Sequence, residues 1–170
     1  MSKASKDFLP LTLAILTVSD SRSEAEDTSG HYLKEAAEEA GHRIAARAIV
    51  KDNLYKIRAM VSNWIADDAI QVILINGGTG FTQHDNTPEA LKPLFDREIE
   101  GYGELFRMVS FEEIGTSTIQ SRALAGMANQ TVIFVMPGST RACQTAWEHI
   151  IEAQLDARNG PCNFTPHVKK

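Results

Sequence analysis

Three short runs of apolar, largely β-branched residues stand out along the chain: Thr12–Val18, Ile70–Ile75 and Thr131–Met136. Runs of this length without polar alternation are typical of strands that are buried on both faces of a sheet. A fourth segment, His42–Val50, alternates apolar and polar residues. This alternation predicts a half-buried strand near the edge of the same sheet.

Between these strands the apolar residues recur with the helical period. We expect one helix to begin at a Thr28 or Ser29 cap and to end at Gly41. A second helix is expected over 53–66, where the apolar positions again follow the helical period.

Later in the chain, Thr87 is expected to start a helix with Pro88 at its first position, and Thr140 to start the last helix. The stretch 101–129 is interpreted as mainly helical, with breaks near Gly115 and Gly126.

Strands that alternate with helices predict an α/β fold: a three-layer, mostly parallel, doubly wound sheet with helices on both faces. The 170 residues, 43% of them hydrophobic, suffice for one core. We therefore expect a single domain over residues 1–170, with its core at about 12–158 and an irregular C-terminal tail. In such folds ligands bind at the carboxyl ends of the strands, near the point where the strand order reverses.

The composition excludes some classes of partner. A net charge of −5 argues against nucleic-acid binding, which requires a basic surface. Lys3 and Lys6 precede an apolar run, but Pro10 interrupts that run and no signal-peptide cleavage pattern follows. No apolar run approaches the length needed to span a membrane. With two cysteines that lack a paired spacing, we expect reduced thiols in a cytoplasmic protein without a membrane partner.

Glycine-bearing or small polar turns follow the three buried strands: Ser19-Asp20-Ser21, Gly77-Gly78-Thr79-Gly80 and Pro137-Gly138-Ser139. Such turns allow consecutive backbone N–H groups to point into one concavity and bind a phosphate. The alternative is that a tight turn between strand and helix simply needs glycine. Three such turns at one end of a sheet favour the phosphate site.

Familiar site motifs are absent from the sequence. There is no P-loop, the Gly77–Gly80 turn does not have the dinucleotide-binding spacing, and Gly115–Ile119 misses the nucleophile elbow at its last residue. The five histidines lack zinc-ligand spacing, so surface or helix-cap positions are expected for them.

Two carboxylates, Asp52 and Asp85, are expected at the same end of the sheet as the glycine turns. Carboxylates beside a phosphate repel it unless a cation intervenes, and Mg²⁺ is held by one or two carboxylates plus substrate phosphates. Taken alone, each aspartate is better explained as a helix cap or a surface turn, but together with the glycine turns the two favour a metal–phosphate site. Further polar candidates are Ser110, Ser117 and Arg122; Arg122 is a phosphate clamp or an ordinary surface residue of a helix.

At these residues the sequence resembles the MoaB/MogA family of molybdopterin-binding proteins. The resemblance rests on the glycine turn and the segment after it, and on segments near the first and last buried strands. The matching segments are Ile73–Gly80, Asp85–Ala90, Thr17–Asp20, Asp27–Gly30 and Met136–Ser139. Two further segments, Phe111–Ser117 and Cys162–Phe164, resemble the MoaB branch of this family.

The resemblance implies a function in molybdenum cofactor biosynthesis, a homo-trimer or a hexamer made of two trimers, and binding of molybdopterin. In active relatives the terminal phosphate of molybdopterin attacks the α-phosphorus of ATP in the presence of Mg²⁺. Carried onto this chain, Asp52 and Asp85 match the carboxylates linked with metal and catalysis, and Gly77–Gly80 match the cradle of the pterin phosphate. Other proteins of the same pathway are implied as partners.

The chain departs from the adenylating pattern at two places. The segment Phe81–His84 lacks an expected arginine, and Ser139 follows Pro137-Gly138 where relatives often have a second proline. Two hypotheses therefore stand: an Mg²⁺-dependent molybdopterin adenylyltransferase, and a non-catalytic molybdopterin- or precursor-binding carrier. A generic small-anion-binding protein is the third.

Overall fold

The computed structural model describes residues 5–170, so Lys3 lies outside the described residues. One sheet contains six strands in the order β2-β1-β3-β6-β5-β4. Their bounds are β1 Thr12–Val18, β2 Arg43–Val50, β3 Val72–Asn76, β4 Arg97–Glu98, β5 Leu124–Ala128 and β6 Thr131–Met136. The three apolar runs and the alternating segment thus form the strands expected from the sequence.

The strands β2, β1, β3 and β6 are parallel, and β5 and β4 continue the sheet in antiparallel pairings. From β1 the chain crosses to β2 on one side and then to β3 on the other. The strand order therefore reverses between β1 and β3, which is where such folds bind their ligands.

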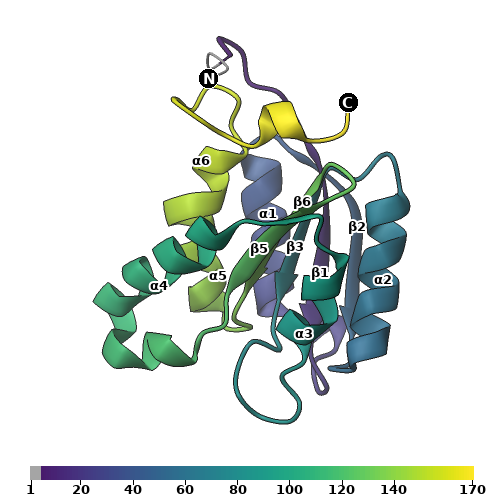
Figure 1. Cartoon of the computed structure of the whole chain (residues 1–170), viewed down its shortest axis with the longest axis vertical. Helices are drawn as coiled ribbons and strands as arrows, with labels where there is room; N and C mark the ends of the chain where they lie inside the picture. Colours follow the sequence, from purple (N-terminus) through teal and green to yellow (C-terminus); the bar gives the residue numbers. More distant parts are fainter. Residues whose placement is uncertain (1–4) are drawn as a thin grey trace.

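Helices cover both faces of the sheet, as Figure 1 shows, and this confirms the expected three-layer α/β fold. The helices α1, α4 and α5 pack on one face, and α2 and α3 pack on the other. Their bounds are α1 Thr28–Glu39, α2 Leu54–Ala66, α3 Thr87–Leu91, α4 Glu100–Ile114, α5 Thr140–Ala146 and α6 Glu152–Gln154. A π-helical turn, Trp147–Ile151, joins α5 to α6.

The central strands explain this arrangement. Along β1, for example, Leu13 and Ile15 pack against α1, α4 and α5, while Ala14 and Leu16 pack on the side of α2 and α3. Because successive side chains of a strand point to opposite faces, an uninterrupted apolar run supplies both hydrophobic layers.

The expected helical stretch 101–129 is wrong in its second half. Helix α4 ends at Ile114, a 3-10 helix covers Gly115–Gln120, and Leu124–Ala128 is strand β5. The segment is rich in Ala and Gly, which have low strand propensity. A two-residue turn at Asn129 and Gln130, both with positive φ, folds it back onto β6, and this pairing overrides local propensity.

Two helix starts and one histidine also differ from expectation. The cap of α1 is Asp27, whose side chain accepts from the Gly30 N–H, rather than Thr28 or Ser29. Pro88 is the second residue of α3, after Thr87. His42, expected at the surface, is buried, and its Nδ1 accepts a hydrogen bond from the Leu11 N–H. Burial lowers the pKa of His42, since it disfavours the charged ring.

Both cysteines are free thiols; Cys143 is buried and Cys162 is exposed. In residues 5–170, every helix is too short or too polar to cross a membrane.

Candidate functional site

A pocket of about 520 Å³ lies at the carboxyl ends of β1, β3 and β6. The turns after these three strands form most of its wall, and the 3-10 helix that follows α4 closes one side. The lining residues are Val18, Ser19, Ser21, Arg22, Gly77, Gly78, Thr79, Gly80, Asp85, Ile114, Ser117, Gln120, Ser121, Pro137 and Gly138. We call this the glycine-loop pocket.

The Gly77-Gly78 turn requires glycine for two reasons. Both residues have positive φ, +98° and +68°, a region that other residues rarely adopt. A Cβ atom on Gly77 would lie 2.2 Å from the Val18 carbonyl oxygen, and one on Gly78 would lie 2.2 Å from Thr87 Oγ1. The backbone of this turn therefore packs directly against β1 and α3, and no side chains at these two positions fill the pocket.

Asp85 stabilises the loop that follows this turn. Its Oδ2 accepts hydrogen bonds from the N–H and the hydroxyl of Thr82, at 2.9 and 2.6 Å. Burial alone would raise the pKa of Asp85, but hydrogen bonds from Thr82 and Gly80, together with the charge of Arg122, lower it. Asp85 is therefore ionised at neutral pH and lies at the wall of the pocket.

Arg122 holds the same loop from the outside. Its Nε donates to the Gly80 carbonyl at 2.9 Å, its Nη2 donates to the Asp85 carbonyl at 2.7 Å, and its Nη1 pairs with Glu89. The hydrogen-bond donors of the guanidinium are thus used within the protein. The sequence left two interpretations of Arg122, a phosphate clamp and an ordinary surface residue of a helix. The geometry favours neither, because the hydrogen bonds of Arg122 hold the loop in place.

Three aspartates gather beside the pocket, from three different loops. Asp20 Oδ1 accepts a hydrogen bond from the Asp52 N–H at 2.9 Å. Asp52 Oδ1 accepts from the backbone N–H and from the side-chain amide of Asn86, the residue after Asp85. The pKa of Asp52 is raised, first by burial and then by the negative charges of Asp85 and Asp20, against the opposing hydrogen bonds from Asn86. A cation at this place would relieve the repulsion.

This donor set fits Mg²⁺ in its chemistry. Within residues 5–170 no three ligating side chains converge on one point. However, Mg²⁺ commonly takes one or two carboxylates and completes its coordination with water and substrate phosphates. Asp52 and Asp85 are the residues that would hold it.

Arg22 is a pocket residue that the sequence reasoning missed. It lines the cavity, and its Nη1 donates to Ser29 Oγ at 3.2 Å. Ser29 in turn donates to the Gly138 carbonyl at 2.7 Å, so these bonds connect the turns after β1 and β6. Arg22 and Asp85 are the two charged side chains in the lining. The available signal was its position four residues after the end of β1.

Buried Asp27 organises this side of the pocket. Its carboxylate accepts from Thr17 Oγ1 at 2.8 Å, from the Gly30 N–H at 2.9 Å and from Arg47 Nη2 at 2.9 Å, and Arg22 Nη1 lies 4.0 Å away. Burial would raise the pKa of Asp27, but the hydrogen bonds from Arg47, Gly30 and Thr17 lower it. Asp27 is therefore ionised, and its carboxylate connects β1, β2 and the start of α1 beside Arg22.

The pocket wall contains most of the binding residues expected from the sequence. These are Ser19, Gly77, Gly78, Thr79, Gly80, Asp85, Ser117, Pro137 and Gly138. Asp20, Asp52, Ser110, Arg122 and Ser139 are not in the lining. Asp20 and Asp52 stand beside it, Ser110 is buried in α4, Arg122 holds the loop, and Ser139 caps α5 by accepting from the Ala142 N–H.

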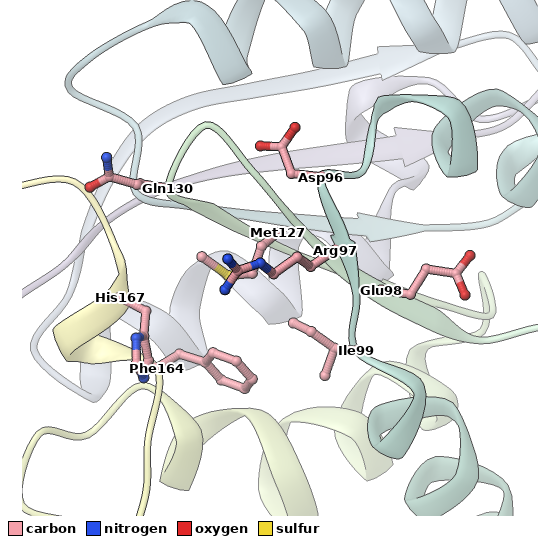
Figure 2. Close-up of a pocket in the computed structure, with 8 residues that line it drawn as sticks. All are labelled: Asp96, Arg97, Glu98, Ile99, Met127, Gln130, Phe164 and His167. Atoms are coloured by element: carbon pink, nitrogen blue, oxygen red, sulfur yellow. The ribbon is translucent and has the colours of Figure 1, made fainter. Parts of the chain in front are cut away.

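A different pocket, of about 490 Å³, lies at the β4 edge of the sheet (Figure 2). Its residues come from β4, the β5–β6 hairpin and the C-terminal segment, and Arg97 and Glu98 of β4 carry opposite charges. Gln130 of this pocket immediately precedes β6, which places it near the amino end of the parallel strands. It contains no glycine turn, so the glycine-loop pocket is the better candidate site.

Comparison with known proteins agrees with this fold. Residues 14–157 match a family model described as "Probable molybdopterin binding domain". The chain is 66% identical over its full length, and that of the relative, to molybdenum cofactor biosynthesis protein B of Escherichia coli (strain K12).

Two solved structures are also similar. A crystal structure of molybdenum cofactor biosynthesis protein B has a TM-score of 0.84 and 42% identity, covering 86% of this chain and 92% of that one. The tungsten cofactor synthesizing protein MoaB from Pyrococcus furiosus has a TM-score of 0.75 and 34% identity, covering 83% and 90%.

We predict that Asp27→Asn lowers the free energy of unfolding by about 3 kcal/mol at pH 7, because it leaves Arg47 without its buried counter-charge. Since the folded-state pKa of Asp27 is lowered, its contribution is fully present above the ordinary aspartate pKa, about 3.9, and is lost as the pH falls through the folded value. Urea unfolding from pH 3 to pH 7 measures both effects.

The matched control is Asp68→Asn, an exposed carboxylate on the surface after α2, which should change stability by no more than about 0.5 kcal/mol. Equal unfolding free energies for Asp27→Asn and Asp68→Asn would contradict the role of Asp27.

Proposed function

This chain belongs to the MoaB/MogA family of molybdopterin-binding domains and acts in molybdenum cofactor biosynthesis, and we propose that it binds molybdopterin in the glycine-loop pocket. One observation carries the proposal: the pocket at the reversal of strand order combines the backbone of Gly77–Gly80 with the guanidinium of Arg22. Backbone amides and an arginine are the groups that bind a terminal phosphate.

The rest of the pocket suits the organic part of such a ligand. Ser117, Gln120 and Ser121 line the cavity together with Asp85 and the glycine turn, and Ile114 adds an apolar residue to the wall. A largely preformed pocket with a few polar groups fixes the orientation of a heterocycle. At about 520 Å³ the cavity is within the usual size range of small-molecule sites.

We further propose adenylyl transfer as the reaction. An oxygen of the molybdopterin phosphate attacks the α-phosphorus of ATP, the bond from that phosphorus to the bridging oxygen breaks, and pyrophosphate leaves. Mg²⁺, if held at Asp52 and Asp85, would neutralise the charge of the two phosphate groups. The protein residues themselves mainly bind and align: Arg22 and the amides of Gly78 and Thr79 hold the attacking phosphate, because the Gly77 N–H already donates to the Met136 carbonyl and the Gly80 N–H to Asp85.

A non-catalytic carrier is the second candidate, and one observation favours it. The loop that contains Asp85 uses this carboxylate internally, through Thr82, and uses Arg122 on its own carbonyls. Asp85 and Arg122 therefore shape the loop that lines the pocket. A protein that only binds molybdopterin would need this structural role and no catalytic one. The two candidates share the pocket and differ in the requirement for Asp52.

We also propose that the working unit is a homo-trimer or a hexamer in the cytoplasm, which interacts with other proteins of cofactor biosynthesis. Large apolar side chains are exposed along α4 and the 3-10 helix after it: Met108, Phe111, Ile114 and Ile119. Met108, Phe111 and Ile114 follow at three-residue spacing along α4, and exposed apolar side chains that are neighbours on a helix favour burial against another chain. Ile114 also lines the pocket, so self-association would bring a second copy close to the ligand.

Arg22→Gln is expected to weaken molybdopterin binding about tenfold, since it removes one charge-assisted hydrogen bond to the phosphate. Titration calorimetry measures the affinity, and thermal unfolding checks that the variant is folded. Arg43→Gln, an exposed arginine at the start of β2, is the matched control and should bind as wild type does. An unchanged affinity for Arg22→Gln would remove Arg22 from the proposed site.

Asp52→Asn is expected to reduce pyrophosphate release from ATP and molybdopterin by about 100-fold or more, while leaving molybdopterin affinity nearly unchanged. Because the folded-state pKa of Asp52 is raised, its charge destabilises the fold at neutral pH, so the variant should melt at the same temperature as wild type or higher. Wild-type protein that binds molybdopterin but releases no pyrophosphate would establish the carrier instead.

Multi-angle light scattering should give the mass of three or six chains, and Met108→Glu together with Phe111→Glu should shift that mass toward one chain, because two charges would enter an apolar interface. A wild-type mass of one chain would contradict the proposed assembly.

A further inference from the structure

A small pocket of about 280 Å³ lies directly beside the glycine-loop pocket. Its walls come from α3, from Arg107 of α4 and from the segment that leads into β5. Ser121 lines both pockets, so the two cavities meet at this residue. We call the small cavity the basic pocket.

The basic pocket concentrates positive charge in an acidic protein. Lys92, Arg107 and Arg122 line it against one carboxylate, Glu89, although the whole chain has a net charge of −5. Glu89 is already paired with Arg122. Lys92 is exposed and has no ion-pair partner among residues 5–170. Uncompensated cations in a concave surface attract an anionic ligand.

Arg107 is held in place while part of its guanidinium stays available. Its Nη1 donates to the carbonyl oxygens of Ser121 at 3.3 Å and Ala123 at 3.1 Å. In the described part of the chain, its Nε and Nη2 have no hydrogen-bond acceptor. Arg122 differs, because it donates to the carbonyls of Gly80 and Asp85 and adds charge rather than free donors.

Ser121 adds a second indication of a ligand at the junction of the two pockets. Its Oγ is buried and has no hydrogen-bond partner in the described structure. Buried hydroxyl groups are normally paired, and this one would gain a partner if a rotation of the Ser121 side chain turned it toward a ligand oxygen in either cavity. At about 280 Å³ the basic pocket is at the small end of ligand sites, which suits a compact anion better than a whole nucleotide.

We propose that the basic pocket binds a diphosphate group, with Lys92 and Arg107 as its direct contacts and Ser121 between it and the glycine-loop pocket. The group is free pyrophosphate or the polyphosphate end of a nucleoside triphosphate. The second source rests on the proposed function, because adenylyl transfer in the adjacent pocket needs a place for the diphosphate that leaves. The basic pocket would supply the cations that the segment Phe81–His84 does not contain.

The test is titration calorimetry of the full chain with inorganic pyrophosphate in a buffer that contains EDTA, so that the aspartates cannot bind the anion through a metal ion. Wild-type protein should bind, and Lys92→Glu should weaken binding about tenfold. Lys56→Glu makes the same change at an exposed lysine on α2 and should leave the affinity unchanged. Arg107→Gln should also weaken binding, and Lys92→Glu keeps the test valid if Arg107→Gln fails to fold.

Competition then separates the two sources. If ATP displaces pyrophosphate from wild-type protein, the site takes the polyphosphate end of a nucleotide; if ATP does not compete, the site takes the free anion. No binding of pyrophosphate, or equal weakening by Lys92→Glu and Lys56→Glu, would overturn the proposal. Molybdopterin affinity is measured separately with the same proteins. If wild-type protein does not bind molybdopterin, the proposed function is refuted, while the result with pyrophosphate still stands.

Discussion

The buried carboxylate of Asp27 is the interaction on which the candidate site depends. It caps α1 and binds Arg47 from the edge strand β2 and Thr17 from β1; Thr17 Oγ1 in turn accepts from Asn76 Nδ2 at the end of β3. A buried charge requires such partners, because its desolvation is otherwise very costly. The hydrogen bonds to Asp27 therefore hold the ends of β1 and β3, strand β2 and the start of α1 together. Arg22 lies beside this cluster.

Charge is distributed unevenly around the carboxyl end of the sheet. Asp20, Asp52 and Asp85 come together on one side of the glycine turn, Arg22 lies in the pocket, and the cations of the basic pocket lie beyond Ser121. The overall charge of −5 says little about this arrangement. Small anions respond to local donors and cations, whereas nucleic acid needs a broad basic surface.

Patterning along the chain predicted the elements whose local and tertiary preferences agree. The strands β1, β3 and β6 were recognisable because a run such as Val72–Ile75 can bury both faces only inside a sheet. Strand β5 was missed because its residues have low strand propensity and its identity depends on pairing with β6 through the Asn129-Gln130 turn. Asp27 was not identified as the cap of α1 because Asp27, Thr28 and Ser29 are all suitable cap residues by type. Its buried charge was not foreseen because it depends on Arg47, which is 20 residues away.

By itself, the sequence determined the α/β class and predicted the candidate site at the strand ends, since these follow from the hydrophobic period and from where such folds bind ligands. The requirement for glycine at Gly77 and Gly78 came from the tertiary structure, through their positive φ and their contacts with Val18 and Thr87. The tertiary structure decided which polar groups share a cavity. It separated Arg22, which lines the glycine-loop pocket, from Arg122, which holds a loop, and it placed Lys92 and Arg107 in one basic pocket. Side-chain direction and hydrogen-bond partners depend on segments far apart in the chain, and a linear pattern does not encode those contacts residue by residue.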